Sequence, residues 1–325
     1  MKLHRRKFLH LTAGAAALTA ISRTASALDY PTRPVRLILG FQPGGLIDIA
    51  ARLIGSQLSE RLGQRFVVEN RPGASSNIAT SDVVRASPDG YTLLVASNAV
   101  TYNATLYDNL DFNFIRDIAP VAPFVRGPFV MTVSPSVAAK TIPEFIAYAK
   151  ANPGRINMAT AGAGSAAALY GELFERMAGV DLFPVHYRGA GPALVDLMSG
   201  RVEVVFIPVA AVIGYIRSGQ LRALGVTTLR RVDLLSGLPT INEFLQGYEA
   251  NAWGGIGAPA NTPREIIAIL NTHVNAALDD ASLKARLADL GAEPFASSPT
   301  EFGKFIVDET EKWAKVIRTA GIKAE

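Results

Sequence analysis

The chain has 325 residues, 49% of them hydrophobic and 18% charged, which is typical of a globular protein with a substantial core. Its formal net charge is +4, but five of its 32 basic residues lie in the first 27 positions. The other 27 are balanced by 28 acidic residues. The net charge beyond position 27 is therefore about −1, which gives no support for nucleic-acid binding. Because cysteine is absent, disulfides, thiolate zinc sites and thiol nucleophiles are excluded. The histidines beyond position 27, His186 and His273, lie far apart without a carboxylate cluster, so we expect neither a metal site nor a cofactor.

Residues 1–27 have the layout of an export signal: basic residues, a short apolar run, and Ala25-Ser26-Ala27 as a cleavage site. The apolar run is shorter than the roughly 20 residues that cross a bilayer. The Arg5-Arg6 pair followed by Phe8-Leu9 resembles a twin-arginine signal, and an ordinary Sec signal is the alternative. We therefore expect an exported, periplasmic protein that begins at Leu28.

The pattern after this segment predicts a βαβαβ unit, and hence a parallel sheet with right-handed crossovers. Its expected elements are a strand at 35–39, a glycine loop at 40–45, a helix at 46–62, a strand at 66–69, a weaker helix ending at 86 and a strand at 91–96. The middle of the chain repeats this order with different residues. There we expect a strand at 155–160, a glycine-rich corner at 161–165, a helix at 166–177, a strand ending at 185, a corner at 187–189, a helix at 192–198 and a strand at 202–207.

Two similar α/β halves in one chain suggest two lobes with a cleft between them. Capping-box patterns begin at Thr141, Thr262 and Ser298, and the last two predict a helical C-terminal region. We expect the chain to cross between lobes near 124–128 and 250–258. The predicted division is an export signal at 1–27, the first lobe at 28–127 with its second part at 253–325, and the second lobe at 128–252.

Both glycine corners follow strands, and in open α/β sheets ligands bind beyond the carboxyl ends of strands. Backbone N–H groups and the helix dipole favour an anion there. The backbone candidates are Pro43, Gly44 and Gly45 in the first corner and Gly162 and Gly164 in the second. The polar candidates near strand ends are Ser97, Asn98, Thr101, Asn103, Thr160 and Ser165, each of which is about as well explained as a helix cap or turn residue.

Asp48 lies in the first turn of the helix that follows the first corner, at a position that should point away from the core. It could read an amine or hydroxyl of a ligand, or simply complement the helix dipole. The sequence leaves both roles open.

Neither corner fits a nucleotide or catalytic motif. The first holds a proline and lacks the third glycine of G-x-G-x-x-G, and neither ends in the G-K-[ST] of a P-loop. The serine of Gly162-Ala163-Gly164-Ser165-Ala166 is displaced from its place in G-x-S-x-G, and His186 is the only base nearby in sequence. An exported hydrolase is therefore a minor alternative, and we expect capture of a ligand without turnover.

The whole region after the signal closely resembles the substrate-binding receptors of tripartite tricarboxylate transporters, the Bug receptors. The motifs that carry the resemblance are Pro43-Gly44-Gly45 with Asp48, Val68-Glu69-Asn70-Arg71-Pro72-Gly73-Ala74, Pro88-Asp89-Gly90-Tyr91, Gly164-Ser165, Glu172-Leu173-Phe174, Tyr187-Arg188-Gly189, Leu238-Pro239-Thr240, Gly257-Ala258-Pro259 and Lys312-Trp313. The resemblance implies a type II periplasmic-binding-protein fold of class α/β, whose two lobes close by hinge motion on a small carboxylate gripped by backbone groups. The implied binding set adds Phe41, Ala168, Tyr187, Arg188 and Ile207 to the candidates above.

Two departures from the family pattern concern the ligand. Ala168 stands where members commonly have a histidine, and Ile207 followed by Pro208 where an acidic residue is common. This makes the wall of the second lobe smaller and less polar, so we expect an aromatic or aliphatic mono- or dicarboxylate in preference to an amino acid. The implied partners are membrane permease subunits, and the alternative is a sensor read by a membrane kinase.

Overall fold

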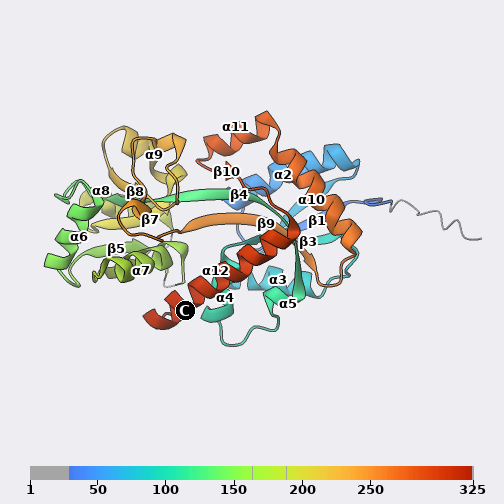
Figure 1. Cartoon of the computed structure of the whole chain (residues 1–325), viewed down its shortest axis with the longest axis horizontal. Helices are drawn as coiled ribbons and strands as arrows, with labels where there is room; N and C mark the ends of the chain where they lie inside the picture. Colours follow the sequence, from blue (N-terminus) through green and yellow to red (C-terminus); the bar gives the residue numbers. More distant parts are fainter. Residues whose placement is uncertain (1–28, 163, 188, 324–325) are drawn as a thin grey trace, which may run out of the picture.

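The computed structural model describes residues 29–162, 164–187 and 189–323 (Figure 1). The predicted export signal and the site candidate Arg188 lie outside the described residues. The strands are β1 (Val35–Leu39), β2 (Phe66–Asn70), β3 (Thr92–Ser97), β4 (Ile118–Val133), β5 (Asn157–Thr160), β6 (Phe183–His186), β7 (Val204–Pro208), β8 (Arg222–Val226), β9 (Asn251–Pro259) and β10 (Glu293–Pro294). The helices are α2 (Leu46–Leu62), α3 (Asn77–Val84), α4 (Ala99–Leu106), α5 (Phe114–Asp117), α6 (Ile142–Ala151), α7 (Ala166–Ala178), α8 (Ala190–Ser199), α9 (Val209–Arg217), α10 (Arg264–Leu278), α11 (Ala281–Asp289) and α12 (Pro299–Ala320), with 3-10 turns η1 (Ala74–Ser76), η2 (Asp233–Leu235) and η3 (Ile241–Glu243).

These strands form one mixed sheet in the order β2-β1-β3-β9-β4-β7-β5-β6, with β8 and β10 also paired to β4. The neighbours of β1 are both parallel to it, as are the neighbours of β5. The predicted βαβαβ unit and its repeat are therefore confirmed, and the expected bounds of most elements are correct to within about two residues. The architecture is the two-lobe periplasmic-binding-protein fold.

Strand β4 joins the two halves of the sheet (Figure 1). It pairs with β9 as far as Pro128, opposite Asn251, and with β7 from Phe129, opposite Pro208. The pairing with β9 slips between Pro120 and Ala122 and again between Pro123 and Val125. A proline nitrogen donates no ladder hydrogen bond, which is why such irregularities accompany proline in a strand. The lobe boundaries at 127/128 and 252/253 remain a prediction. The change of the pairing strand of β4 from β9 to β7 supports the first of them.

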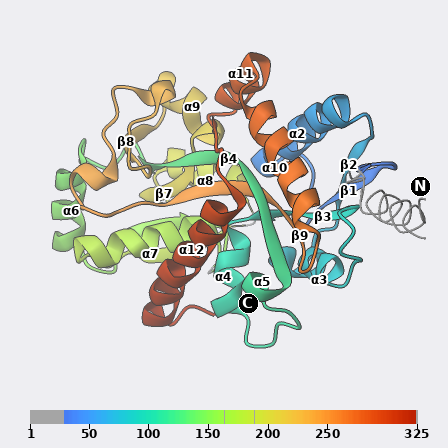
Figure 2. The same ribbon diagram turned by 45° about the vertical axis from the view of Figure 1, so that its right-hand side comes forward.

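Helix α12 packs against both halves of the molecule. Phe302 and Ile306, in its first part, belong to a core cluster with Trp253 of β9. Trp313 and Ile317, in its last part, belong to the core that also contains residues of α6 and α7. Figure 2 shows α12 running beside α7, and the two helices are in contact. The placement of 253–325 in the first lobe stays a prediction, although the end of α12 lies against the second half.

Candidate functional site

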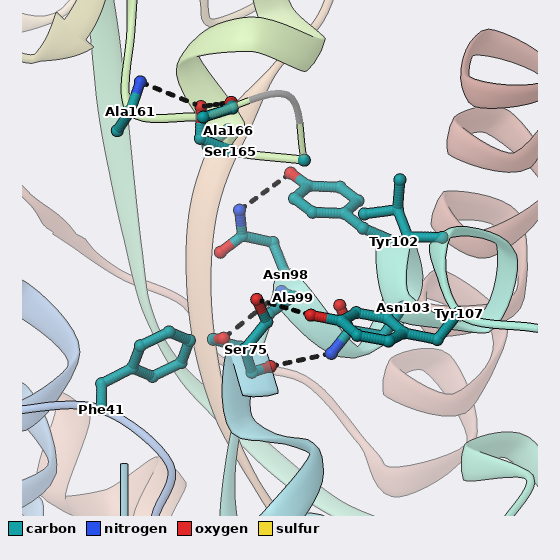
Figure 3. A pocket seen from close by; sticks show the side chains of 14 residues that line it. Phe41, Ser75, Asn98, Ala99, Tyr102, Asn103, Tyr107, Ala161, Ser165 and Ala166 are labelled. Carbon is teal, nitrogen blue, oxygen red and sulfur yellow. Dashed lines mark hydrogen bonds between the residues drawn. The ribbon is translucent and has the colours of Figure 1, made fainter. Parts of the chain in front are cut away.

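A cavity of about 430 Å³ lies where α4 and α7 begin, one helix from each half of the chain (Figure 3). Both helices follow strands, so their N-termini lie beyond the carboxyl ends of β3 and β5. The side chains around the cavity are small, amide, hydroxyl, aromatic or, for Leu106, aliphatic, and none of the described lining residues is charged. They are Phe41, Ser75, Ser97, Asn98, Ala99, Tyr102, Asn103, Leu106, Tyr107, Ala161, Gly162, Gly164, Ser165 and Ala166.

Asn98 is the polar residue that directly precedes α4. Its Nδ2 donates to Tyr102 Oη at 2.8 Å, and Figure 3 shows the amide oxygen directed away from Tyr102. The preceding Ser97 is buried, and its hydroxyl accepts from Ala99 N at 3.3 Å. These contacts fix the start of α4 and leave the amide oxygen of Asn98 on the cavity side.

Ser75 reaches the cavity from a turn with unusual backbone conformation. Ala74, Ser75 and Ser76 have φ values of 44°, 50° and 76°, in the left-handed region that residues with a side chain seldom adopt. Asn103 holds this turn by donating from Nδ2 to Ser75 O at 2.8 Å. Gly40 permits it, because a Cβ there would overlap Ser76. Strained backbone conformations that the surrounding structure holds in place are typical of functional sites.

Ser165 caps α7 and organises the corner before it. Its Oγ accepts from Ala168 N at 3.2 Å and Ala161 N at 3.3 Å, and donates to Gly162 O at 2.7 Å. With these bonds made, the hydroxyl has no hydrogen-bond contact to a base. His186 Nδ1 is bonded to Thr160 Oγ1 at 2.6 Å instead. Among the described residues, Ser165 and His186 thus form no nucleophile–base pair at this corner.

The first turn of α7 leaves backbone donors at the cavity. In an α-helix the first N–H groups have no partner within the helix, and the Ser165 cap satisfies that of Ala168. No hydrogen bond joins the N–H groups of Ala166 and Ala167 to another described residue, and both lie at the helix end, where the dipole is positive. Together with the start of α4, this gives the cavity a preference for an anion without a charged side chain.

A smaller, mainly apolar chamber of about 190 Å³ adjoins the cavity and shares Ala161, Ser165 and Ala166 with it. Its other lining residues are Phe129, Ala159, Thr160, Ala167, Gly189, Ala190, Ala193, Val205, Phe206, Ile207 and Pro208. None of these described side chains is charged. The chamber can therefore take an apolar part of a molecule whose polar end lies in the larger cavity.

Asp48 is only 4% exposed, although its helical position predicted a side chain pointing away from the core. The carboxylate accepts from Gly44 N at 3.0 Å, Asn70 Nδ2 at 2.9 Å and Arg52 Nε at 3.1 Å. Burial alone would raise the pKa of Asp48, but these hydrogen bonds and the Arg52 charge outweigh burial and lower it. The Gly44 N–H that we expected at a ligand is thus donated within its own loop, where Gly44 has a φ of 95°.

The remaining candidates are placed as follows. Tyr187 donates to Asp196 Oδ2 at 2.8 Å, on α8, and burial together with this carboxylate raises the pKa of Tyr187 to about 12. The structure brings together Phe41, Ser97, Asn98, Asn103, Gly162, Gly164 and Ser165 at the cavity, and Thr160 and Ile207 at the chamber. Pro43, Gly44, Gly45, Asp48, Ala168 and Tyr187 do not line either space. Their contact with a ligand stays a prediction.

Sequence reasoning missed Ser75, Tyr102 and Tyr107. Tyr102 stands four residues after Asn98, the spacing that places two side chains on one helix face, so this residue carried a usable signal. Ser75 carried none, because its position depends on the left-handed turn. Among the residues with a described position, no three or more histidine and carboxylate side chains come together as a metal site would require. Likewise, no helix in the described ranges is long and apolar enough to cross a bilayer.

The fold and the site define a periplasmic binding protein, and solved structures agree. The structure of R. palustris Rpa4515 with adipate superposes with a TM-score of 0.78 at 38% identity, covering 90% of this chain and 99% of that one. MatC from Rhodopseudomonas palustris with bound malate gives a TM-score of 0.74 at 31% identity, covering 89% and 100%.

The sequence relationship is equally specific. The family model described as tripartite tricarboxylate transporter family receptor matches residues 50–322. Protein BugT of Bordetella pertussis is 36% identical over 312 residues, which cover 94% of this chain and 95% of BugT. The chain belongs to the tripartite tricarboxylate transporter receptor family, and the resemblance stated from its motifs is confirmed.

Proposed function

We propose that this chain is a periplasmic solute-binding receptor that captures a small carboxylate for a tripartite tricarboxylate-type transporter. The observation that carries the proposal is the meeting of two helix N-termini, α4 after Asn98 and α7 after Ser165, at one cavity without a charged lining residue in the described chain. Such ends stabilise an anion through backbone N–H groups and the helix dipole. The adipate and malate bound in two structural relatives support this choice of ligand class.

Within that class, we propose an aromatic or aliphatic mono- or dicarboxylate in preference to an amino acid. The apolar chamber beside the cavity, which includes Ile207, suits a ring or a methylene chain. An ammonium group in a partly enclosed site is stabilised best by a negatively charged partner, and none of the described residues around either space is a carboxylate. The nearest candidate by sequence, Asp48, is buried and already bonded to Arg52 and Asn70.

We propose that capture proceeds by closure of the lobes about β4 and the start of β9. The cavity draws residues from both halves, so a bound acid gains all its contacts only when the halves are close together. Gly164 already lies close to the first half, because a Cβ there would be 2.9 Å from Leu106 Cδ1. Membrane permease subunits would then bind the closed form.

A ligand screen tests the proposal. Protein refolded to strip co-purified ligand is titrated by calorimetry with adipate, succinate, glutarate, benzoate, aspartate and glutamate, and with adipamide as the uncharged counterpart of adipate. The proposal expects at least one of the first four acids to bind and adipamide to bind far more weakly. Binding of aspartate or glutamate alone would refute the preferred ligand class, and equal binding of adipate and adipamide would refute anion capture.

A further inference from the structure

Asn103 presents an amide oxygen at the ligand cavity, because both N–H bonds of its amide are used elsewhere. Its Nδ2 donates to Ser75 O at 2.8 Å and to Asn77 Oδ1 at 2.7 Å. A backbone carbonyl only accepts, so the bond to Ser75 fixes which end of the amide is the nitrogen. No hydrogen bond joins Asn103 Oδ1 to another described residue, although Asn103 is 3% exposed and lines the cavity. This oxygen is therefore an acceptor that a ligand can use.

Asn98, which precedes the same helix, has the same arrangement. Its Nδ2 donates to Tyr102 Oη at 2.8 Å and to Tyr170 Oη at 3.4 Å. Figure 3 shows the amide oxygen of Asn98 on the opposite side from Tyr102. No other described residue donates a hydrogen bond to this oxygen, and Asn98 lines the cavity. Two amide oxygens from the region of α4 are thus available as acceptors on the wall that the first half contributes.

The wall that the second half contributes has the reverse character. The first turn of α7 offers the N–H groups of Ala166 and Ala167, which are donors. An ionised carboxylate has only acceptor oxygens, so it suits the α7 wall and cannot hydrogen-bond to the amide oxygens of the α4 wall. A second hydrogen-bonding group on the ligand must therefore be a donor if it is to satisfy Asn98 or Asn103.

The unpaired oxygens decide which kind of acid fits best. A hydrocarbon chain that covers such an oxygen removes water from it and gives no hydrogen bond in return, which is unfavourable. A hydroxyl group donates one hydrogen bond and carries no charge, so it satisfies the oxygen without the desolvation cost of an ammonium group. A site built to hydrogen-bond a hydroxyl discriminates against the analogue that lacks it.

We propose that Asn98 and Asn103 are specificity-determining residues that select a hydroxycarboxylic acid. The carboxylate lies at the first turn of α7, and the hydroxyl donates to an amide oxygen on the α4 side. The inference rests on the proposed function and narrows its ligand class to acids that carry a hydroxyl group. Because the two contacts come from different halves, a hydroxylated acid makes both only when the halves are close together, so the hydroxyl favours the closed state.

The test compares acids that differ by one hydroxyl group. Calorimetry gives the dissociation constants for four pairs: succinate and malate, glutarate and 2-hydroxyglutarate, adipate and 3-hydroxyadipate, and benzoate and 4-hydroxybenzoate. The members of a pair have the same carboxylates, so the ratio of their dissociation constants isolates the effect of the hydroxyl. We expect the hydroxylated acid to bind about tenfold more tightly in at least one pair, the effect of one net hydrogen bond to an otherwise unpaired acceptor.

The same ratio is then measured in Asn98→Ala and Asn103→Ala, each of which removes one amide oxygen. We expect it to fall to about one in at least one of these variants. Asn98→Gly is the second route if Asn98→Ala folds poorly, since glycine is well tolerated before a helix. Asn271→Ala is the matched control and should keep the wild-type ratio. Its amide donates to Val121 O and Ser297 O, and Asn271 does not line the cavity.

The outcomes separate the inference from the proposed function. Equal binding with and without the hydroxyl in all four pairs would overturn this inference alone. A hydroxyl preference that survives in both Asn98→Ala and Asn103→Ala would overturn it as well. A wild-type protein that binds none of the eight acids would overturn the proposed function and the inference with it.

Discussion

Ser165 offers a way to separate the stability of the site from its electrostatics. Aspartate is as good an N-cap as serine, and a negative charge at a helix N-terminus is favourable, so Ser165→Asp should keep α7 intact. Its carboxylate would lie at the edge of a cavity of about 430 Å³. We therefore expect Ser165→Asp to fold normally and to repel a bound carboxylate.

The size of the effect follows from Coulomb's law. Two unit charges about 5 Å apart repel by roughly 0.8 kcal/mol in water and roughly 3 kcal/mol at an effective dielectric constant near 20. This range corresponds to a loss of affinity between about fourfold and about 150-fold. Ser165→Ala should do the reverse: it removes the acceptor of the Ala168 and Ala161 N–H groups and costs about 1 kcal/mol of stability, with no repulsion of the ligand.

The assay combines urea unfolding with calorimetric titration of adipate or whichever acid binds the wild type most tightly. Ser165→Asn is the matched control, because it caps a helix like aspartate but carries no charge. We predict that Ser165→Asp loses about 1 kcal/mol of unfolding free energy, because its carboxylate cannot replace the bond that Ser165 Oγ donates to Gly162 O. We also predict that it loses affinity and that salt partly restores the affinity. Wild-type affinity in Ser165→Asp, or an equal loss in Ser165→Asn, would refute the claim that the start of α7 holds an anion.

Three further predictions concern stability. Gly40→Ala places a Cβ against Ser76 and should lower the free energy of unfolding by about 1–3 kcal/mol in urea titrations, whereas an unchanged value would show that the strained turn adapts freely. Burial raises the pKa of Glu175 to about 7, so its contribution to stability is complete below its unfolded pKa and is lost as the pH rises through 7. Glu175→Gln should therefore be more stable than wild type at pH 8 and not at pH 5 in thermal melts. The lowered pKa of Asp48 has the opposite sign, so its contribution is complete above the unfolded value near 4 and lost below it. Asp48→Asn should show a weaker loss of stability than wild type when unfolding is followed from pH 5 to pH 3.

The parallel units of the fold could be predicted because their periodicity is local. The alternation of apolar strands and amphipathic helices around α2 and α7 identifies each βαβ unit without tertiary information. Strand β4 could not be predicted, since Pro120, Pro123 and Pro128 break its pattern, and only the paired β9 shows how the strand accommodates them.

The residues of the site also include some that could be predicted from the sequence and some that could not. Asn98 and Ser165 were predictable because they follow strands and precede helices, the places where ligands and caps both occur. Ser75 depends on a left-handed turn that tertiary contacts impose, so no local signal in the sequence marks it. Asp48 shows the limit of a helical wheel. Its place in the first turn of α2 was predicted correctly, but its burial was not, because the partners Asn70 and Arg52 are known only from the structure.

The most direct test of the account is a crystal structure of the protein bound to the acid that it binds most tightly, with adipate as the first choice. We predict a carboxylate in the cavity between α4 and α7, its oxygens within about 3 Å of backbone N–H groups in the first turn of α7. A carboxylate bound outside this cavity, or one held mainly by lysine or arginine side chains, would contradict the account.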